Sequence, residues 1–215
     1  VNFCFDMLRK IRLTLAIICF TLITLLFLDF TGTLHTWFGW LAKIQFLPAV
    51  LALNLGVVIA LVIITLLFGR VYCSVICPLG VFQDIASWVS ARRKKKKYRF
   101  SYAPAHSWLR YIVLAIFIII LLLGPGAIAA IIAPYSAYGR IAQNLFAPIY
   151  GWCNNLLAYF AERADSYAFY STEVWIRSIP VFVIAAVTFV ALIVLAWRNG
   201  RIYCNTICPV GTLLG

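Results

Sequence analysis

Four cysteines stand in two matched pairs that could hold a metal ion or a redox group. Cys73 and Cys77 lie in the segment GRVYCSVICPLG, and Cys204 and Cys208 lie in GRIYCNTICPVG. The two segments start 131 residues apart and share eight of their twelve residues. Residues four apart in a helix lie on one face, so each pair could bind one ion. Four thiolates from two halves suffice for an iron–sulfur cluster or a tetrahedral ion.

Several kinds of chemistry remain open for these thiols. The C-x3-C spacing differs from the C-x2-C of ferredoxins and zinc ribbons, so it does not specify the cofactor. A redox iron site, a dithiol switch, a copper(I) site, a structural zinc and simple packing are all compatible with it. We favour the redox iron site because the whole motif is repeated. A disulfide is disfavoured on the reducing, cytoplasmic side of a membrane.

Arginine and tyrosine recur at fixed places beside the first cysteine of each pair. Arg70 and Arg201 precede that cysteine by three residues. A nearby cation lowers the pKa of a thiol, so we assign these arginines to electrostatic tuning of the site. Tyr72 and Tyr203 directly precede the cysteine, and we expect them to anchor the membrane interface or to pack against a cofactor.

The composition indicates a membrane protein. The chain has 215 residues, of which 65% are hydrophobic and 11% are charged, against about 25% charged in soluble domains. Crossing the hydrocarbon core takes a helix of about 20 residues. Four apolar runs predict such spans: Leu13–Leu28, Pro48–Phe68, Trp108–Leu123 with a continuation to Ile132, and Pro180–Trp197. We therefore expect an all-α integral membrane protein with four transmembrane helices, in a single membrane domain, 1–215, made of two like halves, 1–98 and 99–215.

Charge predicts the orientation of these spans. The net charge is +12, and four crossings would place 14 of the 18 basic residues on one side. The positive-inside rule makes that side cytoplasmic, with both termini on it. The basic run Arg92–Arg99 is then a topology determinant that also suits anionic lipid headgroups, and we expect no nucleic-acid partner.

Segments outside the spans are predicted to lie along the membrane surface. Apolar residues recur at helical spacing over Leu79–Ser90, which predicts an amphipathic helix beginning at Pro78. A like helix is expected after Pro209. Since the sequence reaches only Gly215, we expect the protein to continue beyond it.

Two aromatic-rich segments are expected on the outer side. Thr31–Leu47 and Ala133–Ile179 connect the predicted spans there. Within the second, Ile141–Phe160 predicts a short surface helix broken at Pro148. The aromatic residues suit the membrane interface and could also line a site for a quinone.

The doubled Y-C-x3-C-P-x-G motif at the ends of the second and fourth spans resembles the membrane ferredoxins of the NapH, NosR and CcoG type. The stretches HTWFGWLAKIQFLPAVLALN and APYSAYGRIAQNLFAPIYGWCNNLLAYFAERADSYAFYSTEVWIRS are similar to a bacterial branch of that group. The resemblance implies electron transfer at the inner membrane, in some members from quinol and in others in the service of copper enzymes. It also implies a ferredoxin-like domain with 4Fe-4S clusters after the second motif, and carries over the four motif cysteines as redox or metal ligands.

We therefore expect an electron-transfer subunit rather than a stand-alone enzyme. It would relay electrons between a quinol or an outer-face partner and iron–sulfur centres on the cytoplasmic side. Two alternatives remain. The chain could be a copper-binding assembly factor that uses the same thiols, or a structural membrane anchor for a ferredoxin domain. The expected partners are the lipid bilayer, redox proteins and a quinone.

Overall fold

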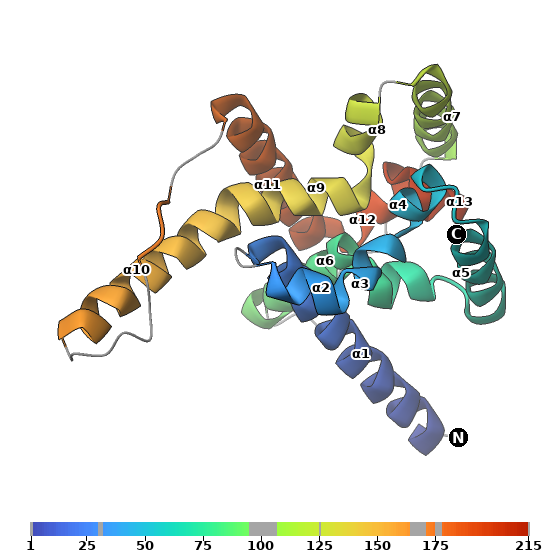
Figure 1. The fold of residues 1–215 in the computed structure, drawn as a ribbon. Coiled ribbons are helices and arrows are strands. Elements are labelled where there is room, and N and C mark those ends of the chain that lie inside the picture. Colours follow the sequence, from blue (N-terminus) through green and yellow to red (C-terminus); the bar gives the residue numbers. More distant parts are fainter. Residues whose placement is uncertain are drawn as a thin grey trace.

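The computed structural model describes residues 2–29, 32–94, 107–124, 126–163, 171–174 and 178–214, and helices are the only regular secondary structure over these residues. Most helices meet in a central region, from which α1, α5, α7, α10 and α11 reach outward (Figure 1). The first half comprises α1 (Asn2–Leu28), α2 (Thr33–Phe38), α3 (Trp40–Lys43), α4 (Phe46–Leu51), α5 (Leu55–Phe68), the π-helical turn η1 (Tyr72–Ile76) and α6 (Pro78–Lys94). The second half comprises α7 (Ser107–Leu123), α8 (Gly126–Ile132), α9 (Pro134–Ile141), the π-helical turn η2 (Ala142–Phe146), α10 (Ala147–Arg163), α11 (Ile179–Asn199), α12 (Ile202–Thr206) and α13 (Pro209–Leu213).

Two of the four predicted spans are long and apolar enough to cross a membrane. They are the 22-residue stretch Met7–Leu28 of α1 and the 21-residue α11. The other two runs form shorter apolar helices, α5 with 14 residues and α7 with 17. At about 1.5 Å per residue, α5 covers only about 21 Å, less than the hydrocarbon thickness of about 30 Å.

The second predicted span is not one helix, and that expectation was wrong. The chain leaves helical geometry at Ala52–Asn54, between α4 and α5, where Leu53 has a positive φ of 51°. Leu53 is 89% exposed, and α4 and α5 pack against each other across the break. Apolar composition alone could not reveal this break, because no glycine or proline marks it.

The broken helix brings the end of the first outer segment against the first cysteine motif. The Tyr72 hydroxyl donates a hydrogen bond to Gln45 Oε1 at 3.0 Å and accepts one from the Phe46 amide at 3.0 Å. Gln45 Nε2 also donates to the Ile76 carbonyl at 3.2 Å. Gln45, at the end of the expected outer segment, therefore contacts the first motif, which the sequence places at the other end of the second predicted span.

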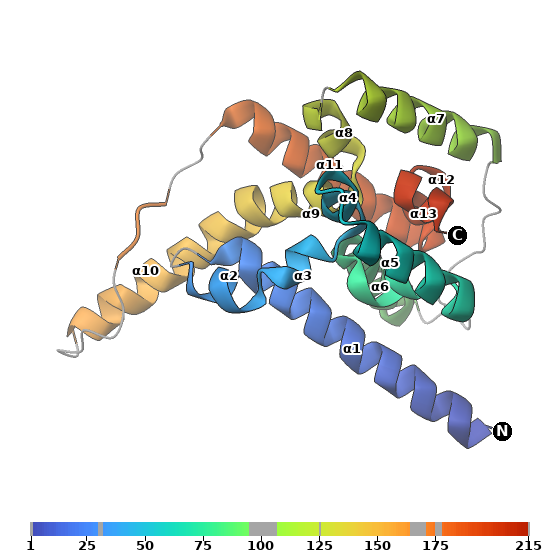
Figure 2. The ribbon, with the colours of Figure 1, turned by 45° about the vertical axis from the view of Figure 1, so that its right-hand side comes forward.

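The predicted surface helix of the second half is longer than expected. Helix α9, the turn η2 and α10 follow one another without interruption, and α10 projects from the central region (Figure 2). Pro148 does not break this helix, contrary to the prediction. It lies in the first turn of α10, directly after the wider π-helical turn, where the helical hydrogen-bond pattern is already altered.

One buried cluster joins the two halves. It holds Ile23 of α1, Leu61 of α5, Tyr138 of α9 and Leu192 of α11 together with motif cysteines. Tyr138 packs its ring against Phe20 and Phe27, and its hydroxyl is 2.6 Å from Thr24 Oγ1. The center of the protein is therefore built from segments distant in the sequence.

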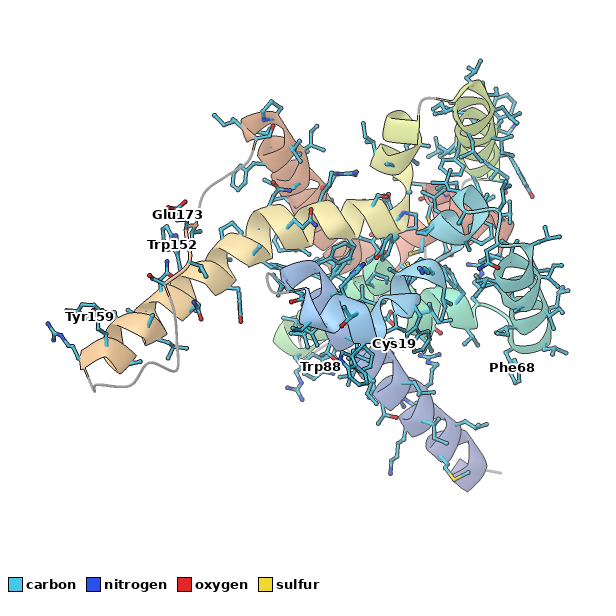
Figure 3. All side chains as sticks on the ribbon, viewed as in Figure 1. Cys19, Phe68, Trp88, Trp152, Tyr159 and Glu173 are labelled. Atoms are coloured by element: carbon cyan, nitrogen blue, oxygen red, sulfur yellow. The ribbon has the colours of Figure 1, made fainter. Side chains whose placement is uncertain are left out.

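The outward surfaces of the helices are strongly apolar. Leu66 on α5 and Leu122 on α7 are each 81% exposed, and Val187 on α11 is 63% exposed. Figure 3 also shows Phe68 at the end of α5, and Trp152 and Tyr159 on α10, away from the central region. Large exposed apolar surfaces mark contact with lipid or with another protein, and here they continue the apolar helices that could enter a bilayer.

Helix α6 confirms the predicted amphipathic helix and shows how its faces are turned. Its polar side chains Gln83, Ser87 and Ser90 are buried against the protein, whereas Ile85 and Trp88 are exposed. This arrangement is the reverse of a helix on a soluble protein, and it suits an apolar face in contact with lipid. The basic residues 95–99 and the expected boundary between the halves at 98 and 99 lie outside the described residues.

Candidate metal centre

The two cysteine motifs begin and turn in the same way. Their first glycines, Gly69 and Gly200, have positive φ values of 69° and 68° and end helices α5 and α11. Cys77 and Cys208 precede proline and are extended, with ψ of 114° and 115°. Proline disfavours helical geometry in the residue before it and is well placed at the start of a helix. Each motif therefore ends one helix and starts another.

The backbone within each motif forms the same wide turn. The Cys77 amide donates to the Tyr72 carbonyl at 2.9 Å, and the Cys208 amide donates to the Tyr203 carbonyl at 3.0 Å. These bonds reach back five residues, as in a π-helix. The turn brings both cysteines of a motif to the same end of the helix that follows.

The last glycine of each motif permits a close backbone approach. A Cβ atom on Gly80 would collide with the Cys73 carbonyl oxygen, and one on Gly211 would collide with the Cys204 carbonyl oxygen. Only glycine fits at either place without moving the backbone. The repeat thus conserves a three-dimensional unit and not only a spacing.

The structure brings all four motif cysteines to one place. Cys73, Cys77, Cys204 and Cys208 are buried, with exposed fractions of 7, 3, 6 and 3%. Cys73, Cys77 and Cys208 belong to the same buried cluster, and the Cys204 thiol interacts electrostatically with the other three. The site is therefore assembled from both halves.

Burial dominates the ionisation of these thiols. It raises the pKa of all four, and it raises that of Cys208 to about 12 even though the Gly211 amide opposes the shift. Repulsion from neighbouring thiolates raises the pKa of Cys77 and Cys204 further. Arg201 and Arg70 lower the pKa of Cys73, as the sequence suggested for these arginines, but burial outweighs them. Without a metal the thiols are protonated at neutral pH.

The two arginines also tie one half to the other. Arg70 in the first motif donates a hydrogen bond to Asn205 Oδ1 in the second. Arg201 in the second motif forms an ion pair with Asp84 of α6, which follows the first motif. Sequence reasoning identified the arginines but not these partners.

The motif tyrosines both pack against the buried cluster, Tyr72 fully and Tyr203 partly buried. Tyr72 is 2% exposed and is held by Gln45 and Phe46, so it does not lie at the membrane interface. The Tyr203 hydroxyl lies 3.5 Å from the Ile132 carbonyl, and the pKa of Tyr203 is raised by burial and by the thiolates of Cys208 and Cys204. Both rings thus border the cysteine cluster.

Two of the sulfur atoms accept hydrogen bonds. The Gly211 amide donates to Cys208 Sγ at 3.3 Å, and Gln83 Nε2 donates to Cys204 Sγ at 3.4 Å. Gln83 lies on α6 and is 1% exposed. Hydrogen bonds to sulfur ligands orient them and tune the metal group that they hold.

Residues 50–97 and 181–215 match the family model described as "4Fe-4S binding domain", and each matched segment contains one cysteine pair. The chain is also 31% identical over 126 residues to the "Ferredoxin-type protein NapH" of Escherichia coli (strain K12). Both findings support a relationship to NapH-like ferredoxin-type proteins. The match to NapH covers 51% of this chain and 42% of the relative. No solved structure matches.

The chemistry of the four sulfur donors fits an iron–sulfur group. The thiols are buried, come from two like motifs and interact electrostatically with one another. A buried oxygen near Cys204, Gln83 Oε1, has no hydrogen-bond partner in the described part of the chain. Among the described residues, no three His, Cys, Asp or Glu side chains stand close enough for a single metal ion. A cluster contains several irons and sulfides, so it needs wider spacing between its ligands.

Several residues of the site carried no signal in the sequence. Gln45, Gln83, Asp84 and Asn205 contact the motifs, but each stands alone in its segment. One weak signal exists for Gln83. The repeat offset of 131 residues pairs it with Leu214, so a polar residue stands where the second half has an apolar one.

Proposed function

We propose that the protein is a membrane electron-transfer subunit whose four motif cysteines hold an iron–sulfur group. The single observation that carries this proposal is the gathering of Cys73, Cys77, Cys204 and Cys208 in one buried cluster from two like motifs. The "4Fe-4S binding domain" match, which includes both pairs, supports it. A repeated ligand pair is what a cofactor held between two halves requires.

The residues around the four cysteines would have different roles. The four thiolates would bind the group, which when bound would accept and release single electrons. Tyr72, which is buried, and Tyr203, which is partly buried, border the cysteines and restrict the access of water. Arg70 and Arg201 offset part of the negative charge that thiolate ligands bring into the core. Loading must release the thiol protons, since metals bind thiolates.

The experiment that tests this function measures iron, acid-labile sulfide and copper in anaerobically purified protein. We expect iron and sulfide in the wild type and neither in a variant with all four motif cysteines changed to Ser. A matched control changes Cys19 and Cys153 to Ser, since these lie on α1 and α10, outside the motifs. Its iron content should equal that of the wild type.

The other outcomes point to the remaining candidates. Copper without sulfide would replace electron transfer with copper handling, because soft thiolates also bind copper(I). If the protein contains no metal and the four-serine variant keeps full cellular activity, the chain is a structural anchor. In both cases the iron–sulfur proposal fails.

We infer a multi-pass protein of the bacterial inner membrane with cytoplasmic termini. The apolar α1 and α11 and the exposed apolar faces of α5 and α7 support an embedded protein, and the positive-inside rule supports this orientation. Cys153 on α10 is an exposed native reporter for the outer side. A membrane-impermeant maleimide should label it in intact cells, whereas Lys10→Cys without Cys153 should react only after lysis. The reverse pattern would overturn the orientation.

We infer that quinol is the electron donor and that cytoplasmic iron–sulfur centres, on a ferredoxin-like domain or a partner protein, are the acceptor. An open pocket of about 330 Å³ between the end of α5 and α13 offers a place beside the first motif where a quinol could dock. Leu66 and Leu213 contribute its apolar lining, and Arg70 of the first motif also borders it. A soluble quinol analogue added to the oxidised wild-type protein should bleach the visible absorption of the bound group. It should not do so in Leu213→Trp, whose larger side chain fills the pocket.

A further inference from the structure

Gln83 differs from the other buried polar residues because only the nitrogen of its side-chain amide is hydrogen-bonded. Its Nε2 group donates to Cys204 Sγ at 3.4 Å, while its Oε1 atom has no partner among the described residues. The side chain is 1% exposed. Buried polar atoms are nearly always hydrogen-bonded, and exceptions concentrate at sites with a redox or catalytic role or with an unseen ligand.

The internal repeat shows that this amide is not required by the fold of the motif. Position 83 corresponds to Leu214 in the second half, and Leu214 is also buried, with 5% of its surface exposed. A leucine of similar volume thus occupies the equivalent place. The glutamine therefore adds a polar contact where apolar packing would have served.

The four cysteines consequently have unequal surroundings. The second cysteine of each pair is approached by the backbone amide of the motif glycine, Gly80 or Gly211. The first cysteines differ, because Cys204 receives the Gln83 amide, for which Cys73 has no described counterpart. A side chain of the first half thus acts on a ligand of the second.

We propose that Gln83 is a positioning residue of the four-cysteine site, which fixes the Cys204 sulfur and raises the reduction potential of the group held there. This inference rests on the proposed iron–sulfur function. An N–H group that donates to a ligand sulfur stabilises the more negative, reduced form of the group, and such bonds are one of the means by which proteins set these potentials.

The test compares Gln83→Leu with wild type after reconstitution with Fe²⁺ and sulfide. Leucine copies the residue of the other half, so the variant should fold and bind the same iron and sulfide. At a fixed potential we expect its ratio of reduced to oxidised site to fall by about three- to tenfold, where tenfold corresponds to about 59 mV for one electron. Ser90→Ala is the matched control, because Ser90 is buried on the same helix and bonds the Trp197 carbonyl at 3.0 Å, away from the cysteines.

A second readout needs no bound group. The chain has only three glutamines, Gln45, Gln83 and Gln143, so side-chain amide signals of ¹⁵N-glutamine-labelled protein can be assigned by substitution. In the metal-free protein, Cys204→Ala should shift the Gln83 signal and leave that of the exposed Gln143 unchanged. This readout separates the contact from the cofactor.

The outcomes are distinguishable. If the wild type contains no iron and sulfide, the proposed function is wrong. The amide signal alone would then test the contact between Gln83 and Cys204. An unmoved Gln83 signal in Cys204→Ala overturns the positioning role whatever the protein binds. A potential in Gln83→Leu equal to that of wild type, or an equal fall in Ser90→Ala, overturns the tuning.

Discussion

Arg201 of the second motif binds Asp84 of α6 through two hydrogen bonds, one of them at 2.6 Å from Nε to Oδ1. The two residues are 117 positions apart, so the pair joins the halves beside the cysteines. A guanidinium and a carboxylate matched in this way have a defined mutual orientation. The ion pair is partly exposed, with side chains that are 26 and 37% accessible.

Removal of this ion pair should cost little stability. For Asp84→Asn we expect a loss of about 0.2–1 kcal/mol in the free energy of unfolding, because solvent screens a pair at this level of exposure. Denaturant unfolding in detergent measures it, and Arg201→Lys with the double variant completes the cycle. A loss above about 3 kcal/mol would mean that the pair behaves as a buried one.

Alanine at the last motif glycine should disrupt the site. Gly80→Ala and Gly211→Ala each place a methyl group against a cysteine carbonyl, and we expect a loss of about 1–3 kcal/mol together with most of the bound iron. Gly56→Ala on α5 is the control, since its nearest neighbour would be Asn54 Oδ1 at 3.9 Å. That change should be neutral or stabilising by about 0.5–1 kcal/mol. Equal thermal shifts in all three variants would contradict the close approach.

Removal of the Tyr72 hydroxyl should lower the stability of the protein. Tyr72→Phe leaves Gln45 Oε1 and the Phe46 amide without their bonds in a buried place, which should cost about 1–3 kcal/mol. Tyr111→Phe serves for comparison, because Tyr111 on α7 is 64% exposed. Its melting temperature should stay near that of wild type. If Tyr72→Phe also melts at the wild-type temperature, the hydrogen bonds from Tyr72 to Gln45 and Phe46 do not stabilise the first motif.

The metal-free thiols should react slowly and with a shifted pH dependence. Thiolate is the reactive form, and burial raises the pKa of the four motif cysteines, so alkylation by iodoacetamide should remain slow up to about pH 9 and rise only above it. The exposed Cys153 reports the rate of an accessible thiol in the same sample. Mass spectrometry of peptides resolves the sites. Rapid modification of Cys73 at pH 8 would show that the cluster opens.

The sequence was informative wherever a local pattern determined the structure. The repeat predicted two like turns, prolines predicted the starts of α6 and α13, and apolar spacing predicted α6. The cysteines could be paired within each motif but not placed together across the halves by spacing. Their meeting depends on packing of α1, α6, α9 and α11, which no short segment encodes.

The errors have a common physical origin in long-range contacts. Leu53 interrupts an apolar run at the turn between α4 and α5, and Gln45 is buried because Tyr72 returns to meet it. Propensity and hydropathy describe a residue with its neighbours in sequence. They carry no information on a partner about 30 positions away, such as Ile76 for Gln45.

The buried polar face of α6 has a consequence for biosynthesis. Gln83, Asp84 and Ser90 find their partners at Cys204, Arg201 and Trp197, more than a hundred residues later in the chain. At about 5–20 residues per second, the ribosome needs roughly 5–25 s to reach them. During that interval the first motif is half a site with unpaired polar groups. Assembly of the centre must therefore wait until both motifs have been translated.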